Sequence, residues 1–193
     1  MATDASLLEV EALGCRRGGV WLFAGVQFAV AAGDLLEISG PNGVGKSSLL
    51  RILAGIAPPS QGQVRAHVRT AYSGHEPALK PRRSVHAELD YWAGLYASGR
   101  AVTDALQRFG LDDLAFLECR LLSNGQRRRV ALARCWLADA RLWLLDEPLV
   151  GLDTAGRDAL MAAVRAHLAA GGAAVVVSHQ PLDAPHRRLV LAA

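Results

Sequence analysis

The residues from Gly40 to Ser47 fit the phosphate-binding pattern G-x-x-x-x-G-K-[ST] at every fixed position. A strand expected over 34–39 enters this loop and a helix expected over 46–53 leaves it, so a chance glycine-rich turn is a poor alternative. Backbone N–H groups of such a loop and of the helix start can bind phosphate oxygens. Lys46 adds a full charge toward the β- and γ-phosphates, and the Ser47 hydroxyl is a candidate ligand of Mg²⁺. The candidate nucleotide-binding residues of this loop are Gly40, Pro41, Asn42, Gly43, Val44, Gly45, Lys46, Ser47 and Ser48.

Two acids, Asp146 and Glu147, end the apolar stretch that begins at Arg141. A parallel strand that is buried on both faces needs such a stretch, and open α/β sheets bind ligands at the carboxyl ends of their strands. Asp146 is therefore a candidate to hold Mg²⁺, directly or through water, and Glu147 is a candidate general base that polarises an attacking water. A core strand followed by an acidic turn is the simpler interpretation of this segment taken alone.

A third segment, Leu122 to Gln126, opens a helix that we expect to run to about residue 138. Ser123 and Gln126 have the S-x-x-Q spacing of a capping box, so an ordinary helix start explains part of the segment. A capping box alone gives less reason for glycine at position 125. The arginines 127–129 that follow could form a nucleic-acid-binding patch, a solvated helix face or a positively charged surface near the nucleotide's phosphates.

Together these segments resemble the ATP-binding-cassette (ABC) ATPases, whose motifs occur here in the family's order across residues 7–191. Leu122–Gln126 is similar to the family's signature motif, with Asn124 where glycine is usual. Gly151–Asp153 resembles the D-loop, where two subunits touch. His179 resembles the switch histidine that contacts the γ-phosphate and holds the water.

The resemblance implies an ATP-hydrolysing protein that uses ATP and Mg²⁺. It also implies a head-to-tail dimer in which each ATP lies between the phosphate loop of one copy and the signature segment of the other. The signature residues implied to contact nucleotide are Ser123, Asn124, Gly125 and Gln126. The residues implied to act in catalysis are Lys46, Glu147, His179 and His75, and those implied to hold the metal are Ser47 and Asp146.

The sequence departs from the family pattern at two positions. After the strand expected at 69–72 the family usually has a loop glutamine, where this chain offers His75. Near the N-terminus the family often stacks adenine on an aromatic ring, and this chain offers only Arg16 or Arg17 in the corresponding turn. Either guanidinium could stack on the base.

The expected elements alternate between strands and helices. Strands are expected over residues 7–15, 20–30, 34–39, 63–67, 69–72, 141–148 and 173–178. Helices are expected over residues 46–53, 84–98, 102–109, 123–138 and 154–170. We expect 173–178 to be the last core strand.

The resemblance implies an α/β P-loop NTPase (ABC ATPase) fold with a central, mostly parallel sheet, an N-terminal antiparallel β-subdomain and a small helical insertion over about 76–122. Residues 1–193 are expected to form a single ABC-type ATP-binding domain.

The helix expected over 84–98 carries large side chains at helical spacing. Val85, Leu89, Trp92 and Tyr96 share one face, which predicts packing against the core or a partner. A ligand-stacking set of aromatic rings is the rarer alternative.

Length and composition constrain the function and location of the protein less strongly than the motifs do. The chain has 193 residues and a formal net charge of +3, which does not by itself indicate nucleic-acid binding. Its three cysteines lack C-x-x-C spacing, so we expect reduced thiols in a cytosolic setting. We expect no secretory signal. The longest nearly apolar stretch, 20–32, is too short to span a bilayer, so any membrane role should come through a partner.

One branch of the family is similar in finer detail. The segment Gly74–Lys80, the turn Cys15–Gly19 and the run Val130–Leu137 resemble the ATPase subunits of the cytochrome c maturation system, the haem exporter ATP-binding proteins. This resemblance implies a peripheral protein on the cytoplasmic face of the bacterial inner membrane, joined to integral membrane subunits. Hydrolysis would then be linked to haem export or to release of a haem-loaded chaperone.

Three alternatives remain at this point. The chain could be the ATPase subunit of another small ABC transporter. It could be a non-transport ABC ATPase acting on ribosomes or DNA, although such proteins usually carry paired cassettes or long coiled-coil insertions, and we expect no nucleic-acid partner. It could be a small-molecule P-loop kinase, which would have no use for Leu122–Gln126 or His179.

Overall fold

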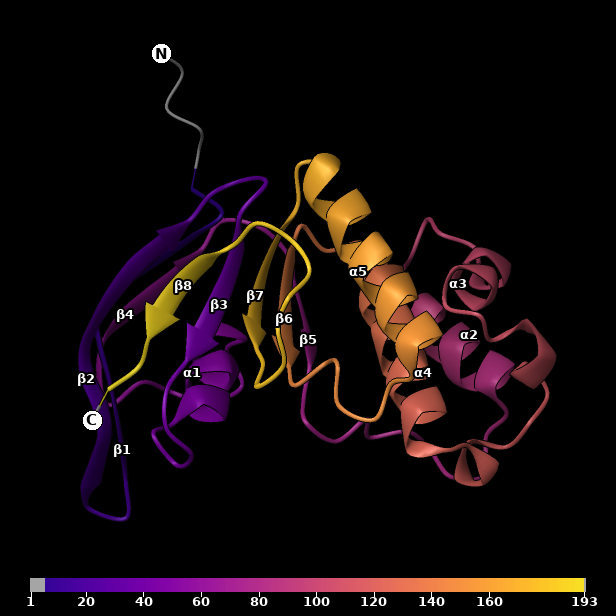
Figure 1. Ribbon diagram of the computed structural model, residues 1–193, viewed down its shortest axis with the longest axis horizontal. Coiled ribbons are helices and arrows are strands. Elements are labelled where there is room, and N and C mark those ends of the chain that lie inside the picture. Colours follow the sequence, from indigo (N-terminus) through magenta and orange to yellow (C-terminus); the bar gives the residue numbers. More distant parts are fainter. Residues whose placement is uncertain (1–5, 193) are drawn as a thin grey trace.

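The computed structural model describes residues 6–192, and the strands in this range form two sheets (Figure 1). The smaller sheet is antiparallel, with the order β2-β1-β4. Its strands are β1 Leu8–Arg17, β2 Val20–Val30 and β4 Gln61–Ala66. β1 and β2 are joined by a tight hairpin turn at Gly18 and Gly19, where both residues have positive φ angles, as such turns require.

The larger sheet has the order β5-β6-β7-β3-β8, and every neighbouring pair in it is parallel. Its strands are β3 Leu35–Ser39, β5 Thr70–Ser73, β6 Leu142–Asp146, β7 Ala173–Val177 and β8 Arg187–Val190. Every residue of β6 and β7 is buried, which explains why these two strands are nearly continuous apolar runs.

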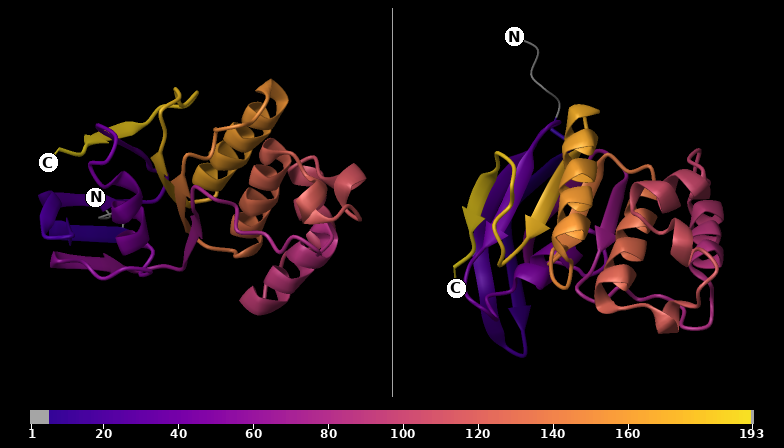
Figure 2. Two further views of the ribbon diagram at one scale, coloured as in Figure 1. Left: turned by 90° about the horizontal axis from the view of Figure 1, so that it is seen from below. Right: turned by 45° about the vertical axis from the view of Figure 1, so that its right-hand side comes forward.

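Helices cover both faces of the parallel sheet. α1 Lys46–Leu53 lies between the two sheets and shares a core cluster with β1 and β2. The other face packs against α4 Asn124–Leu137 and α5 Thr154–Ala169. Beyond α4, at the far end of the molecule from the antiparallel sheet, lie α2 Val85–Tyr96 and α3 Val102–Arg108 (Figure 2). Two short 3₁₀ turns, Asp112–Leu114 and Cys119–Leu121, connect α3 to α4. None of the helices within residues 6–192 has the length and apolar character that crossing a bilayer requires.

The predicted fold class is confirmed: a mostly parallel central sheet, an N-terminal antiparallel sheet, and helices between β5 and α4. The helix predicted over 46–53 has the predicted bounds. The predicted last core strand, 173–178, corresponds to β7, which is buried throughout. The sequence missed β8, a mostly exposed strand that follows β7 and pairs with β3. β8 escaped prediction because it lies at a sheet edge and contains two arginines, so it has no apolar run. Side chains hold it instead: Arg188 bonds Glu37 at 2.7 Å and Arg187 bonds Asp34 at 2.7 Å.

The face predicted for α2 is partly buried. Val85 and Leu89 are fully buried, whereas Trp92 is half-buried and donates its indole N–H to Glu88 at 2.9 Å. The Arg134 guanidinium lies over the Trp92 ring, 5.1 Å from its centroid. Trp92 therefore packs against α4 in the way that the core-packing interpretation predicts.

The cysteines Cys15, Cys119 and Cys135 are free and buried. Burial raises the pKa of the Cys135 thiol to about 12, which keeps it protonated and unreactive.

Candidate active site

The phosphate loop connects β3 to α1, and Gly45 is the N-cap of that helix. Gly45 has φ 102°, and a Cβ atom there would lie 3.0 Å from both Leu22 and the ring of Phe23. Glycine is needed because both the backbone angle and the close approach of β2 exclude a side chain. No side chain caps α1, so the N–H groups of its first turn remain free for an anion.

Lys46 is already held across the loop that it serves. Its side chain is only 8% exposed, and its ammonium donates to the carbonyls of Gly40 at 2.7 Å and Pro41 at 2.9 Å. An ammonium has three N–H donors, so one remains to reach a phosphate oxygen. The loop thus positions the charge before any nucleotide arrives.

Asp146, at the end of β6, is 1% exposed, and both of its carboxylate oxygens are buried without a hydrogen-bond partner. A buried carboxylate in this condition is costly unless a cation or a donor compensates it. Within residues 6–192 no group of three or more His, Cys, Asp or Glu side chains could hold a metal unaided. Mg²⁺ suits such a place, because it commonly binds through one or two protein oxygens together with substrate phosphates. Asp146 and Ser47, which line the same cavity, fit this ion.

Glu147 and His179 form one unit at the carboxyl ends of β6 and β7. Glu147 has φ 51°, a left-handed conformation that is strained for a non-glycine residue. Its N–H donates to the Val177 carbonyl at 2.9 Å, which ties this backbone to β7. Its carboxylate accepts the His179 backbone N–H at 3.2 Å and lies 3.4 Å from His179 Nε2. The carboxylate is therefore aimed by the neighbouring strand.

A cavity of about 520 Å³ brings these groups together. The sequence-predicted residues that line it are Asn42, Gly43, Gly45, Lys46, Ser47, Ser48, His75, Asp146, Glu147 and His179. Gly40, Pro41 and Val44 belong to the same loop without lining the cavity. Sequence reasoning missed Leu22, Val150, Val177 and Gln180 in this lining. Gln180 directly follows His179, and its Oε1 is buried without a partner, so its position in the chain was the available signal.

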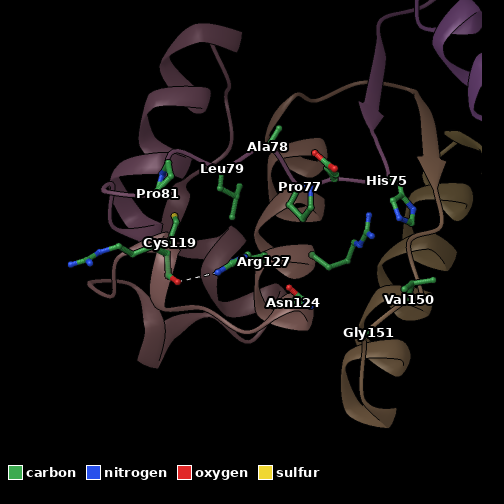
Figure 3. Close-up of a pocket in the computed structure, with 13 residues that line it drawn as sticks. His75, Pro77, Ala78, Leu79, Pro81, Cys119, Asn124, Arg127, Val150 and Gly151 are labelled. Atoms are coloured by element: carbon green, nitrogen blue, oxygen red, sulfur yellow. Dashed lines mark hydrogen bonds between the residues drawn. The ribbon is translucent and has the colours of Figure 1, made fainter.

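The signature segment does not join this cavity. Its first residues form the capping box: the Ser123 hydroxyl accepts the Gln126 N–H at 3.2 Å, and Gln126 Oε1 accepts the Ser123 N–H at 2.7 Å. Asn124 lines a separate cavity of about 580 Å³. Figure 3 shows Asn124 and Arg127 on one side of this second cavity and His75 and Val150 on the other. His75 and Val150 line both cavities.

Comparison with known proteins agrees with this geometry. A family model described as ABC transporter matches residues 23–150. A cytochrome c biogenesis ATP-binding export protein, CcmA 2 of Cupriavidus metallidurans, is 44% identical over 97% of this chain and 96% of the relative. CcmA of Rhodobacter capsulatus is 43% identical over 96% of this chain and 86% of the relative.

Solved structures share the fold. A metal-chelate type ABC transporter in an inward-facing conformation is 27% identical, with a TM-score of 0.81, over 97% of this chain and 80% of that one. The phosphate loop, the two acids and the histidine thus occur in a chain whose sequence and fold both match one family. The chain belongs to the ABC transporter family, as one of its ATP-binding subunits of the CcmA group.

Proposed function

We propose that this chain is the ATP-hydrolysing subunit of an ABC-type membrane complex in cytochrome c maturation, which drives haem export or the release of a haem-loaded chaperone. The observation that carries the proposal is the cavity in which Lys46, Asp146, Glu147 and His179 converge. The identity of 44% to a cytochrome c biogenesis ATP-binding export protein supports the choice of complex. Membership of the ABC family sets the kinase alternative aside.

The chain's own groups bind the triphosphate. The free N–H groups of the α1 start and the remaining Lys46 donor contact the β- and γ-phosphates. The Ser47 hydroxyl and the Asp146 carboxylate would hold Mg²⁺, and this agrees with the unpartnered oxygens of Asp146. When bound, Mg²⁺ neutralises charge on the phosphate oxygens.

Hydrolysis follows from the Glu147–His179 unit. Glu147 accepts a proton from a water whose oxygen bonds to the γ-phosphorus, while the bond from that phosphorus to the bridging β-γ oxygen breaks. The backbone N–H of His179 orients the carboxylate, and its imidazole, with the side chain 55% exposed, is free to reach the γ-phosphate. The products are ADP and inorganic phosphate.

A second copy of the chain completes the site. Because Ser123–Gln126 do not line their own chain's nucleotide cavity, a nucleotide held by Lys46 can meet such a segment only on another copy. The Ser123 oxygen accepts the cap hydrogen bond, which leaves its O–H proton available for a γ-phosphate oxygen. The working form is therefore a nucleotide-sandwich dimer.

The adenine contact falls to the β1–β2 hairpin. Arg16 is engaged with the Gly19 carbonyl at 2.8 Å, which leaves Arg17 as the arginine to stack on the base. The ladder pairs Cys15 with Phe23 but Arg16 with Trp21, so β2 has one extra residue, Leu22, at this point. This bulge turns Leu22 toward the phosphate loop, where it offers an apolar contact for the base.

The partners are integral membrane subunits like CcmB and CcmC, which hold the chain as a peripheral protein on the cytoplasmic face of the bacterial inner membrane. The arginine run 127–129 supports this choice over nucleic acid. Arg127 donates to the Arg120 carbonyl at 3.0 Å, and Arg129 donates to the Gly110 carbonyl at 2.7 Å. These guanidinium groups fasten segments of the chain together, so the run is no open basic patch.

The test combines purification with a cellular readout. The tagged chain is expressed with the maturation system's membrane subunits, extracted in detergent and purified, and c-type cytochromes are detected by haem stain in cells that lack the native subunit. We expect co-purification with those subunits and restored haem staining. Co-purification with ribosomes or RNA would favour a non-transport ABC ATPase. Binding to other membrane subunits without any effect on cytochromes would favour another small transporter.

A further inference from the structure

Arg128 differs from its two neighbours in the arginine run. It is only 5% exposed, whereas Arg127 and Arg129 are half-buried. It lies in the second turn of α4, directly behind the signature residues, and its side chain enters the interior between α4 and the parallel sheet. An arginine side chain is rarely buried so deeply unless its charge is paired.

Both hydrogen bonds of the Arg128 guanidinium end on the active-site loops. Nη1 donates to the Gly74 carbonyl at 3.0 Å and lies 3.5 Å from the Asp146 carbonyl. Gly74 directly precedes His75, and Asp146 directly precedes Glu147. One nitrogen therefore bridges the ends of β5 and β6 at the points where the two loops of the nucleotide cavity begin.

Electrostatic interactions also connect Arg128 with the two acids of the nucleotide cavity. Burial lowers the pKa of the Arg128 guanidinium, while the negative charges of Asp146 and then Glu147 act to raise it. The two acids of the nucleotide site are thus the charges that compensate this buried cation. A neutral side chain of similar length would pack here without the desolvation cost, so packing alone does not account for arginine.

The same helix contacts the D-loop through its first turn. A Cβ atom at Gly125 would lie 2.4 Å from the Gly151 carbonyl oxygen, so the helix backbone rests directly on that loop. α4 therefore carries the signature segment at its start, rests on the D-loop at Gly125, and reaches the acid turn and the His75 loop through Arg128.

We propose that Arg128 is a positioning residue, a buried strut that fixes the acid turn and the His75 loop relative to the signature helix. Through it, the part of the chain that would serve the partner's nucleotide is mechanically joined to the part that holds its own. The inference rests on the proposed roles of Asp146, Glu147 and the signature segment. Arg128 itself does not touch the nucleotide.

The test compares Arg128→Gln with a matched control, Arg129→Gln, in the full chain. Arg129 is on the same helix and also donates to carbonyls, at Phe109 and Gly110, but these lie in the α3–α4 connection. The measurements are kcat and KM for ATP, affinity for a fluorescent ATP analogue, and the thermal midpoint. Arg128→Lys tests rescue by a side chain that keeps the charge and can reach one carbonyl.

We expect Arg128→Gln to lower kcat by about ten- to a hundredfold, the usual effect of a small misplacement of catalytic groups, with ATP affinity within about threefold. Arg128→Lys should recover part of kcat. Arg129→Gln should lower the thermal midpoint and keep kcat within about twofold, since its contacts lie away from the cavity. In a Glu147→Gln background, Arg128→Gln should also weaken ATP-dependent dimer formation.

Two results would overturn the strut. One is an Arg128→Gln variant that keeps wild-type kcat. The other is a loss of kcat that follows the thermal midpoint equally in both glutamine variants, which would make Arg128 a stability residue only. Failure of the proposed function gives a different result, namely normal hydrolysis by Glu147→Gln alone. A kcat loss confined to Arg128→Gln would still support positioning in that case.

Discussion

The helix starts of α1 and α4 are both predicted to meet phosphate, yet they are satisfied in opposite ways. α1 begins at Gly45 with no side-chain cap, so its first N–H groups have no side-chain partner until an anion arrives. α4 begins at Ser123 with both hydrogen bonds of a capping box made. The N-terminus of α1 therefore offers N–H donors to a bound anion. The N-terminus of α4 is satisfied by its own capping box, so it is stable without a ligand and can face another molecule.

The surroundings differ in the same sense. Around α1, Lys46 is pinned by loop carbonyls and Asp146 is left with two unpartnered oxygens. Around the start of α4, Ser123 and Asn124 are exposed, and the buried charge of Arg128 is already bonded to carbonyls of its own chain. This contrast is what we expect if the phosphate-loop region carries the chemistry and the signature region completes the site of another copy.

The largest expected effect is on chemistry alone. Glu147→Gln preserves shape but removes the base, so kcat should fall by about 10²–10⁴-fold while ATP still binds. The variant should accumulate as an ATP-bound dimer, which size-exclusion chromatography with ATP and Mg²⁺ would detect. A variant that stays monomeric or hydrolyses ATP normally would place the base elsewhere.

The next effect is on binding by the phosphate-loop region. Lys46→Ala removes a charge-assisted bond to phosphate of about 1.5–3 kcal/mol, so affinity for ATP should fall at least about tenfold. Equilibrium binding of a fluorescent ATP analogue measures this. Wild-type affinity and turnover in Lys46→Ala would contradict the assignment of the whole loop.

A smaller effect separates the two helix starts. Ser123→Ala should cost about 1 kcal/mol of stability through the lost cap, with little change in ATP affinity of the single chain. It should also weaken ATP-dependent dimer formation in the Glu147→Gln background. Ser84→Ala is the matched control, because the Ser84 hydroxyl caps α2 by accepting the Ala87 N–H at 3.2 Å, away from the nucleotide cavity. Equal loss of dimer in both variants would mean that Ser123 acts only as a cap.

The smallest effect on nucleotide binding is expected at His75, which lies between the two regions and lines both cavities. We expect His75→Ala to leave ATP affinity within about threefold, because the phosphate contacts come from the loop N–H groups and Lys46, and each nitrogen of an imidazole makes one hydrogen bond at most. Haem staining in cells should nonetheless fall, since the loop that joins nucleotide site and insertion is altered. Full haem staining with the alanine variant would remove His75 from the coupling.

Much of the fold was predictable because its signals are local. The bounds of α1 follow from a glycine-rich loop and a run of helix formers, and β6 and β7 are recognisable as apolar runs. The capping box at Ser123 was visible as S-x-x-Q. Each of these depends on residues within a few positions of one another, where spacing determines geometry.

Other features required contacts between distant segments. β8 is held by ion pairs to Asp34 and Glu37, which lie about 150 positions earlier in the chain. Leu22 reaches the nucleotide cavity because a bulge in β2 changes which face it occupies, and no local pattern marks that bulge.

Local sequence patterns predict which residues would carry the chemistry: the phosphate loop, the two acids at a strand end, and the histidine after the next strand. How these residues are held follows only from contacts between segments that are distant in the sequence. Glu147 has a left-handed backbone whose N–H is bonded to the Val177 carbonyl of β7. Arg128 is buried with its guanidinium bonded to the Gly74 carbonyl and close to the Asp146 carbonyl. The signature segment lies outside its own chain's cavity. The physical reason is that charge compensation, strand register and strain are set by neighbours in space, which adjacent residues do not encode.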